Sequence, residues 1–147
     1  MDLKEIIFKR KSTRKYQDIY VEQDKLDQIN KFINETKPLY ENIRVKAYIK
    51  DINCYSVVFP WKPKQVIAIY SEEKEGYLEN VGFIFQQVDL YLNSIGLGSC
   101  WLGLGKPKKN IKKSVDKKID AMETSVSKEL LKVLRVIFAV IVVLGAF

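Results

Sequence analysis

Two short stretches of the sequence hold residue types that suit the binding of an anionic organic molecule. The first is the basic segment, Arg10–Tyr16 (RKSTRKY), which brings cations, hydroxyls and backbone N–H groups together within seven residues. Guanidinium, hydroxyl and N–H donors can together satisfy the oxygens of a phosphate. Cations at the end of a helix also complement the helix dipole, so the local pattern leaves a phosphate site and a structural role both open.

The second stretch is the glycine turn, Gly96–Gly105 (GLGSCWLGLG). It gathers four of the seven glycines in the chain, namely Gly96, Gly98, Gly103 and Gly105. A glycine has no Cβ, so the backbone can bend sharply there or come very close to a neighbour. The turn therefore predicts a place of close backbone approach.

The composition excludes several kinds of catalysis. The chain has no histidine, which removes Ser-His-Asp and Cys-His mechanisms and the common zinc sites. Its two cysteines, Cys54 and Cys100, are too far apart in sequence for a CxxC redox pair or an iron-sulfur motif. We therefore predict no catalytic side chain and no metal ligand, and expect an organic cofactor to supply the reactive atoms.

Length and charge limit the possible partners. A chain of 147 residues with 47% hydrophobic residues fits one domain over residues 1–147. The net charge of +7 suits a polyanion, but the cations gather at Lys9–Lys15 and Lys106–Lys118, with acids between them. We expect neither a nucleic-acid nor a membrane partner, and binding of such a partner through Lys106–Lys118 is the alternative. No signal segment opens the sequence, which predicts a cytoplasmic protein with reduced thiols.

Helical spacing predicts the elements around the two stretches. Residues 2–9 form a short amphipathic helix with Asp2 as its cap, and Asp24–Glu35 a second helix that ends before Pro38. Tyr77–Ile95 forms a long helix that leads into the glycine turn. Its apolar face consists of Val81, Ile84, Phe85, Val88, Leu92 and Ile95.

Alternation predicts strands. Asn42–Ile52 alternates apolar and polar residues, and the apolar runs Tyr55–Trp61 and Gln65–Tyr70 are expected to share a sheet. Ser71–Gly76 is expected to be an acidic loop, and Lys106–Lys118 a mobile surface loop. Arg135–Phe147 is too short to span a bilayer as a helix and favours a buried strand over a tail anchor.

Together the two stretches resemble the flavin-dependent nitroreductase family. Its members begin with a short helix followed by R-R-S-x-R-x-F/Y, which Arg10–Tyr16 matches with lysine at the second position. They later carry a long helix with a pattern like G-x-x-x-Q-x-L-x-L-x-x-x-x-x-G-L-G-T-C-W. Gly82–Trp101 is similar to that pattern, with Gln86 or Gln87 at the glutamine.

The resemblance implies a fold and an activity. The fold would be α+β, a nitroreductase-like three-layer α/β/α sandwich with a mainly antiparallel central sheet. The chain would form a homodimer and hold FMN non-covalently at the interface. Electrons would pass from NAD(P)H through the flavin to a nitroaromatic, a quinone or a similar acceptor.

The resemblance also implies which residues bind the cofactor. Arg10, Lys11, Ser12 and Arg14 would lie on the phosphate side, with Arg10, Ser12 and Arg14 contacting the phosphate and ribityl chain. The backbones of Gly98, Gly103 and Leu104 would approach the isoalloxazine edge. Cys100 and Trp101 are expected to be core residues beneath the turn.

Two features of the family pattern are absent. An A-P-S-x-x-N-x-Q-P-W stretch usually follows the second helix, whereas residues 34–48 read NETKPLYENIRVKAY. A cationic segment usually follows the last strand, but the sequence ends at Phe147, directly after an apolar run. Either a partner subunit covers this end or the chain is incomplete at its C-terminus. In the second case the chain resembles the N-terminal part of a divergent member of the family, in which the missing stretch comes in a later segment. The alternative function is therefore a catalytically inactive module that binds flavin or another anionic ligand.

Overall fold

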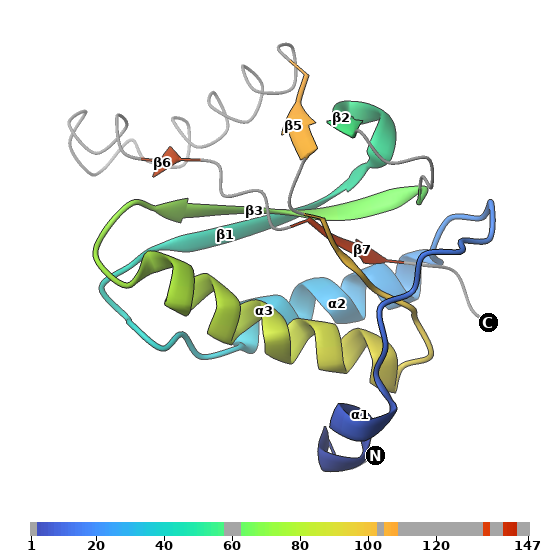
Figure 1. The fold of residues 1–147 in the computed structure, drawn as a ribbon, viewed down its shortest axis with the longest axis horizontal. Helices are drawn as coiled ribbons and strands as arrows, with labels where there is room; N and C mark the ends of the chain where they lie inside the picture. The colour runs from blue at the N-terminus through green and yellow to red at the C-terminus, as the bar shows by residue number, and fades with distance from the viewer. Residues whose placement is uncertain (1–2, 58–62, 103–104, 109–133, 136–139, 144–147) are drawn as a thin grey trace.

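Three α-helices and seven short strands make up the described part of the chain (Figure 1). The structure is a computed structural model that describes residues 3–57, 63–102, 105–108, 134–135 and 140–143. The helices are α1 (Leu3–Lys9), α2 (Gln23–Glu35) and α3 (Tyr77–Ser94), and a 3-10 turn, η1, covers Ile52–Cys54. The strands are β1 (Val45–Asp51), β2 (Tyr55–Val57), β3 (Gln65–Glu72), β4 (Trp101–Leu102), β5 (Gly105–Pro107), β6 (Leu134–Arg135) and β7 (Val140–Val143).

The main sheet is antiparallel at every described pairing. Its strands run in the order β1-β3-β7-β4, and β6 pairs with one end of β3. Strand β1 pairs with β3 along its whole length, from Val45 opposite Ser71 to Asp51 opposite Gln65. Strands β2 and β5 form a separate two-stranded ribbon. These pairings confirm the predicted α+β class with a mainly antiparallel sheet.

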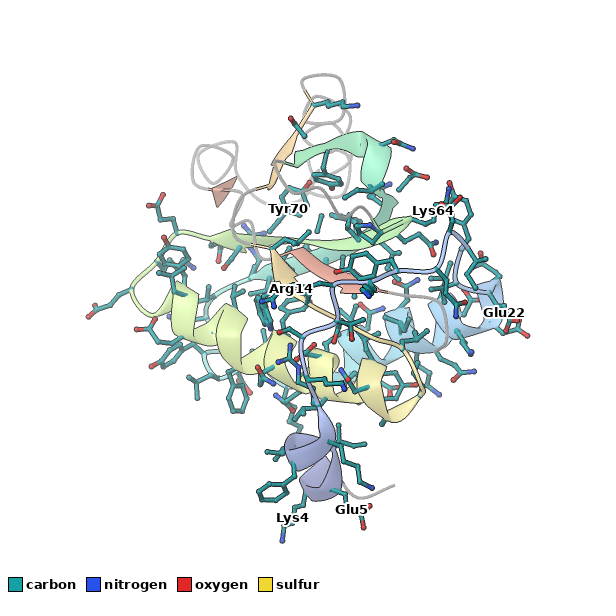
Figure 2. The ribbon with its side chains drawn as sticks, turned by 45° about the vertical axis from the view of Figure 1, so that its right-hand side comes forward. Lys4, Glu5, Arg14, Glu22, Lys64 and Tyr70 are labelled. Carbon is teal, nitrogen blue, oxygen red and sulfur yellow. The ribbon has the colours of Figure 1, made fainter. Side chains whose placement is uncertain are left out.

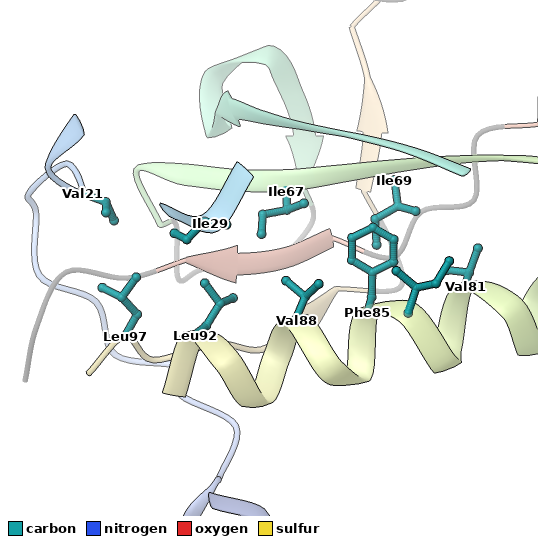
Figure 3. Close-up of a cluster of buried hydrophobic side chains, with 10 residues drawn as sticks. Val21, Ile29, Ile67, Ile69, Val81, Phe85, Val88, Leu92 and Leu97 are labelled. Atoms are coloured by element: carbon teal, nitrogen blue, oxygen red, sulfur yellow. The ribbon is translucent and has the colours of Figure 1, made fainter. Parts of the chain in front are cut away.

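Helices α2 and α3 pack against the sheet through one apolar cluster (Figures 1 and 3). Ile29 comes from α2, Ile67 and Ile69 from β3, and Phe85 and Leu92 from α3. The rings of Phe32 on α2 and Tyr91 on α3 stack with their centroids 4.1 Å apart. Full burial of one such large side chain contributes roughly 1.5–3 kcal/mol, so this cluster fixes α3 against β3.

Strand β3 is covered on both faces. Ile67 and Ile69 point toward the cluster of α2 and α3, so the alternate residues Val66, Ala68 and Tyr70 point the other way. All five are buried, and Tyr70 lies on the side of β3 away from α3 (Figure 2). A strand buried on both faces is what a central strand of a three-layer sandwich requires.

The two ends of α3 are held by specific contacts. At the first turn, the amide oxygen of the buried Asn80 accepts hydrogen bonds from the backbone N–H groups of Leu39 and Tyr40, both at 2.9 Å. At the other end, Gly96 has φ of 78°. The N–H of Leu97 donates to the carbonyl of Leu92 at 2.9 Å, and that of Gly96 to the carbonyl of Asn93 at 3.2 Å. These two bonds form a Schellman motif, which explains why a glycine is needed there.

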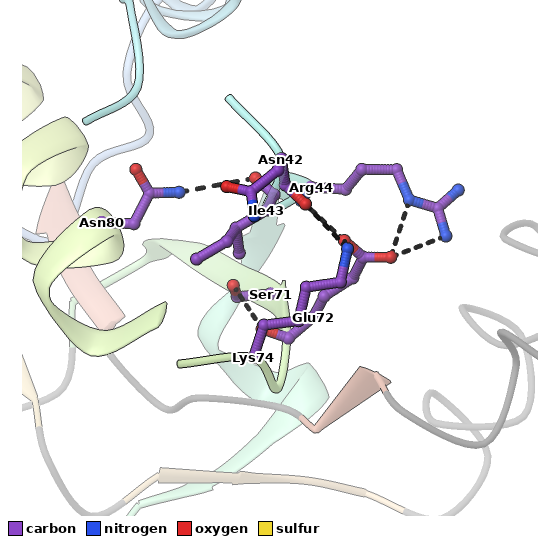
Figure 4. A network of polar contacts seen from close by, with 7 residues as sticks. All are labelled: Asn42, Ile43, Arg44, Ser71, Glu72, Lys74 and Asn80. Atoms are coloured by element: carbon purple, nitrogen blue, oxygen red, sulfur yellow. Dashed lines mark hydrogen bonds and ion pairs between the residues drawn. The ribbon is translucent and has the colours of Figure 1, made fainter. Parts of the chain in front are cut away.

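A buried carboxylate at the end of β3 corrects the prediction that Ser71–Gly76 is a loop (Figure 4). Ser71 and Glu72 belong to β3 and are buried. The Glu72 carboxylate accepts a hydrogen bond from the backbone N–H of Arg44 at 2.9 Å, and pairs with the Arg44 guanidinium and the Lys74 ammonium, both at 3.0 Å. Burial acts to raise the pKa of Glu72, but the N–H of Arg44 and the two cations outweigh it and lower the pKa below its usual value.

Other element predictions are confirmed, or corrected in detail. The helices, the strand at residues 45–51 and the strand at residues 140–143 are confirmed. The runs Tyr55–Trp61 and Gln65–Tyr70 were expected to share a sheet, but the described residues of the first, Tyr55–Val57, form β2 and pair with β5, whereas the second lies in β3 of the main sheet. The 3-10 turn η1 turns the chain after Asp51, and residues 58–61 lie outside the described residues. Lys106 and Pro107 lie in β5 rather than in a loop. The Asp2 cap, residues 109–118 and Phe147 lie outside the described residues.

No helix within the described ranges is both long enough and apolar enough to cross a membrane.

Candidate functional site

The basic segment and the glycine turn lie side by side. Ser12 and Ser99 form an isolated parallel bridge, and the N–H of Thr13 donates to the carbonyl of Ser99 at 2.9 Å. In Figure 1 the segment after α1 runs past the C-terminal end of α3, where the turn begins. Two stretches that are more than eighty residues apart in sequence therefore form one surface.

Gly98 makes this contact possible. A Cβ placed on Gly98 would lie 2.7 Å from the Thr13 hydroxyl oxygen and 2.9 Å from the Thr13 Cβ. Real Cβ atoms essentially never come so close to another heavy atom, so another residue at this position would push the basic segment away. In the structure, the close approach that Gly98 permits is with Thr13.

A buried polar network lies beneath the contact. Asp89 on α3 has 0% of its side chain exposed, and its Oδ2 lies 2.6 Å from Nε of Arg10. This contact is an ion pair without hydrogen-bond geometry, since neither atom has a hydrogen-bond partner within the described chain. The Ser99 hydroxyl donates to Oδ1 of Asp89. The amide of Asn93 donates to the Ser99 hydroxyl and to the Asp89 carbonyl, both at 2.8 Å.

The outer side of the segment is open to solvent. Lys11, Ser12 and Arg14 are exposed, and in Figure 2 Arg14 lies over the middle of the molecule, far from Lys4 and Glu5 on α1. Tyr16, the last residue of the segment, stabilises its conformation, because the Tyr16 hydroxyl donates to the carbonyl of Thr13 at 2.8 Å. Burial raises the pKa of the Tyr16 hydroxyl well above its usual value, so the group stays protonated as a donor.

These residues fit an anionic phosphate. The buried Nη2 atom of Arg10 has no hydrogen-bond partner in the part of the chain that the structure describes. A buried guanidinium nitrogen without an acceptor is costly, and a phosphate oxygen is an acceptor that would satisfy it. The exposed cations Lys11 and Arg14 and the Ser12 hydroxyl belong to the same short segment. The site thus offers charge, hydroxyl and guanidinium donors together.

The structure brings together five of the seven residues that the resemblance implies. Arg10, Lys11, Ser12 and Arg14 lie on the basic segment, which contacts the turn beside Gly98, whereas Gly103 and Leu104 lie outside the described residues. Cys100 is buried and Trp101 packs against the core, as expected. Both cysteines are free thiols.

Sequence reasoning missed the polar residues beneath the contact. Asp89, Asn93 and Ser99 were not predicted to have any role, and Thr13 was considered only as a hydroxyl of the basic segment, not as the residue that packs on Gly98. Asp89 lies four residues after Phe85 and three before Leu92, so it falls on the apolar face of the long helix. A carboxylate on an apolar helix face could have indicated the network, because a buried charge needs a partner of opposite charge or hydrogen bonds.

Other parts of the described structure lack the chemistry of a reactive site. They contain no group of three or more acidic, cysteine or histidine side chains that could hold a metal ion. A groove of about 340 Å³ lies between α2, β1 and the first half of α3. Its lining mixes aliphatic side chains with polar ones such as Asn34, Thr36 and Lys46, and includes none of the predicted site residues.

The fold and the contact between the two stretches define an α+β protein of the nitroreductase fold. Among solved structures, a nitroreductase family protein from Clostridium novyi NT matches with a TM-score of 0.66 and 18% identity, over 99% of this chain and 87% of that one. A nitroreductase with bound FMN from Bacteroides fragilis NCTC 9343 matches with a TM-score of 0.65 and 14% identity, over 100% and 89%. An FMN-dependent nitroreductase from Clostridium difficile R20291 matches with a TM-score of 0.63 and 24% identity, over 96% and 86%.

The family itself follows from the sequence match. The family model described as "Putative TM nitroreductase" matches residues 2–124, which is more than half of the chain. The chain therefore belongs to this nitroreductase family. A search of curated proteins finds no match.

Proposed function

We propose that the protein is an FMN-dependent oxidoreductase that passes electrons from NAD(P)H to a nitroaromatic, a quinone or a similar acceptor. Membership of a nitroreductase family supports this function, as does a fold shared with a nitroreductase that has bound FMN. The observation that carries the proposal is the contact between Ser12 and Ser99, because it joins the two stretches expected to bind opposite ends of one flavin.

Each residue of the site would have a defined part in holding the cofactor. Arg10 and Arg14 would pair with the phosphate, Ser12 would donate its hydroxyl, and Lys11 would add positive charge. The backbone of Gly98 would lie near the ring, and Gly103 and Leu104 remain predicted contacts. A bound FMN supplies the redox chemistry at its isoalloxazine ring, so no side chain of this chain needs to act as an acid or base.

We also propose that the protein is a homodimer built from one domain per chain. Large apolar side chains on α1 and α3 are exposed, with Phe8 at 91% and Phe83 at 45%. Exposed apolar surface of this kind is usually covered by a partner. Sedimentation velocity at micromolar concentration tests this, and a monomer that still binds FMN would reject the dimer while leaving the flavin site in place.

A cytoplasmic location stays a prediction.

The activity test follows NADH and NADPH oxidation anaerobically, with FMN-loaded protein and either a nitroaromatic or a quinone. Acceptor-dependent oxidation of either nucleotide is the expected result. Bound FMN without turnover would support the alternative of an inactive flavin-binding module. Absence of both flavin binding and turnover would reject the proposed function.

A further inference from the structure

We propose that Asp89 is a positioning residue of this site, which holds the Arg10 guanidinium where it can recognise the phosphate of the flavin. The inference rests on the proposed function and adds a residue to it. Asp89 lies in α3 behind the basic segment, with its side chain fully buried. It would act on the ligand only through Arg10 and Ser99.

The buried charge of Asp89 needs compensation. A buried carboxylate is strongly unfavourable unless a cation and hydrogen bonds compensate it. Among the described residues, Arg10 is the cation paired with Asp89, and the Ser99 hydroxyl supplies a hydrogen bond. In return, Asp89 keeps the Arg10 side chain folded inward with only 20% of its surface exposed. Without that carboxylate, the largely buried Arg10 guanidinium would become better hydrated by turning out into solvent.

Asp89 is also connected to the glycine turn through hydrogen bonds. The Asn93 amide donates to the Ser99 hydroxyl, which donates in turn to Asp89. The backbone of Ser99 bridges to Ser12 and accepts the hydrogen bond from Thr13. Asp89 therefore holds both the guanidinium of Arg10 and the turn against which the rest of the basic segment lies. A single carboxylate fixes the relative position of the groups proposed to bind phosphate.

The negative charge of Asp89 and its positioning of Arg10 have opposite effects on the affinity for a phosphate. A carboxylate near a phosphate repels it. If Asp89 acted only through its charge, it would weaken FMN binding, and its removal would strengthen binding. A positioning residue has the reverse signature. Nη2 of Arg10 is buried and has no acceptor in the described structure. The contact with Asp89 therefore holds the guanidinium with a donor left over for a ligand, which favours positioning.

The test compares the affinities of purified protein for FMN and for riboflavin, which lacks the phosphate, by flavin fluorescence titration. The wild type is expected to prefer FMN. Asp89→Asn is expected to reduce the FMN-to-riboflavin affinity ratio on the order of tenfold, the loss typical of a misplaced charge-assisted hydrogen bond. Arg10→Gln should reduce the ratio as well, and adding Asp89→Asn to Arg10→Gln should change it no further.

Glu72→Gln is the matched control. Glu72 is also a buried carboxylate paired with cations, but it lies at the end of β3 and outside the site, so its neutralisation should leave the ratio unchanged. If Asp89→Asn does not fold, Ser99→Ala takes its place, since it removes the hydroxyl from the same network without changing any charge. Circular dichroism establishes that each variant is folded.

The outcomes separate the two proposals. A wild type that binds neither flavin overturns the proposed function and this inference with it. A wild type that prefers FMN, with a ratio unchanged or raised in Asp89→Asn, overturns the inference alone. An equal drop in Glu72→Gln, or a further drop when Asp89→Asn is added to Arg10→Gln, overturns it too.

Discussion

Replacing Gly98 by alanine tests the contact on which the site depends. The added Cβ would lie 2.7, 2.9 and 3.0 Å from Oγ1, Cβ and Cγ2 of Thr13. Rotating the Thr13 side chain could move Oγ1 and Cγ2 but not its Cβ, so the backbone of the basic segment must shift. That shift would strain or break the Thr13 hydrogen bond to Ser99, which measures 2.9 Å.

The size of the effect follows from these contacts. Overpacking of this kind costs about 1–3 kcal/mol, and loss of one backbone hydrogen bond adds about 1 kcal/mol. We expect Gly98→Ala to lower the free energy of unfolding by about 2–4 kcal/mol. Urea unfolding followed by circular dichroism measures this as a lower midpoint at an unchanged slope.

Three further variants make the test specific. Thr13→Ala in the Gly98→Ala background removes the contacts to Oγ1 and Cγ2 and should recover part of the stability, whereas Thr13→Gly also removes the Cβ contact and should relieve the clash fully. Gly82→Ala is the control, because a Cβ there meets nothing within 4 Å in the helix α3. It should stabilise the protein by up to about 1 kcal/mol. A Gly98→Ala variant as stable as the wild type would refute the proposed packing.

Three further predictions concern stability and reactivity. Glu72→Gln should lower the unfolding free energy by about 1–3 kcal/mol at neutral pH. The pKa of Glu72 in the folded protein lies below its usual 4.5, so the stabilisation by its carboxylate is present above pH 4.5 and is lost as the pH falls through the folded pKa. A difference between variant and wild type that persists unchanged into strong acid would contradict this pairing. Asn80→Leu should cost about 2–4 kcal/mol in urea unfolding, because the N–H groups of Leu39 and Tyr40 lose their acceptor; a neutral substitution would disprove that role. Cys54, which is partly exposed, should react with a thiol reagent faster than the buried Cys100 in native protein, and equal rates would argue against the described packing of the turn.

The sequence predicted the parts of the fold that depend on local pattern. Apolar spacing located α2 and α3, because the stripe that includes Val88 and Leu92 must face a core. Alternation located β1, and clustered glycines predicted the sharp turn where Gly96 adopts its positive φ. These features are set by neighbours in sequence, so a single chain reveals them.

The errors arose where tertiary contacts override local chemistry. Glu72 was predicted to lie in an acidic loop, but Arg44 and Lys74 make its burial possible at the end of β3, and neither pairing can be inferred from spacing. The apolar run that begins at Tyr55 was expected to share a sheet with Gln65–Tyr70, yet its described residues, Tyr55–Val57, pair with residues 105–107. Strand partners that are distant in sequence are not specified by the pattern of either strand alone.

Only the parts of the candidate site that depend on local sequence were predictable. The residue types of the basic segment and the glycine turn indicated phosphate binding and close approach, and the family resemblance joined the two stretches. The partner that fills the space at Gly98 was not predictable, because it is Thr13, far away in sequence. Nor was the pairing of Arg10 with Asp89, which requires α1 and α3 to be in place.

The most direct test of the central claim is the absorption spectrum of the purified protein before and after addition of FMN and gel filtration. We expect a flavin spectrum that stays with the protein at close to one FMN per chain, and weaker retention of riboflavin. A colourless protein that retains no FMN at micromolar concentration would contradict the assignment of the basic segment and the glycine turn as a flavin site.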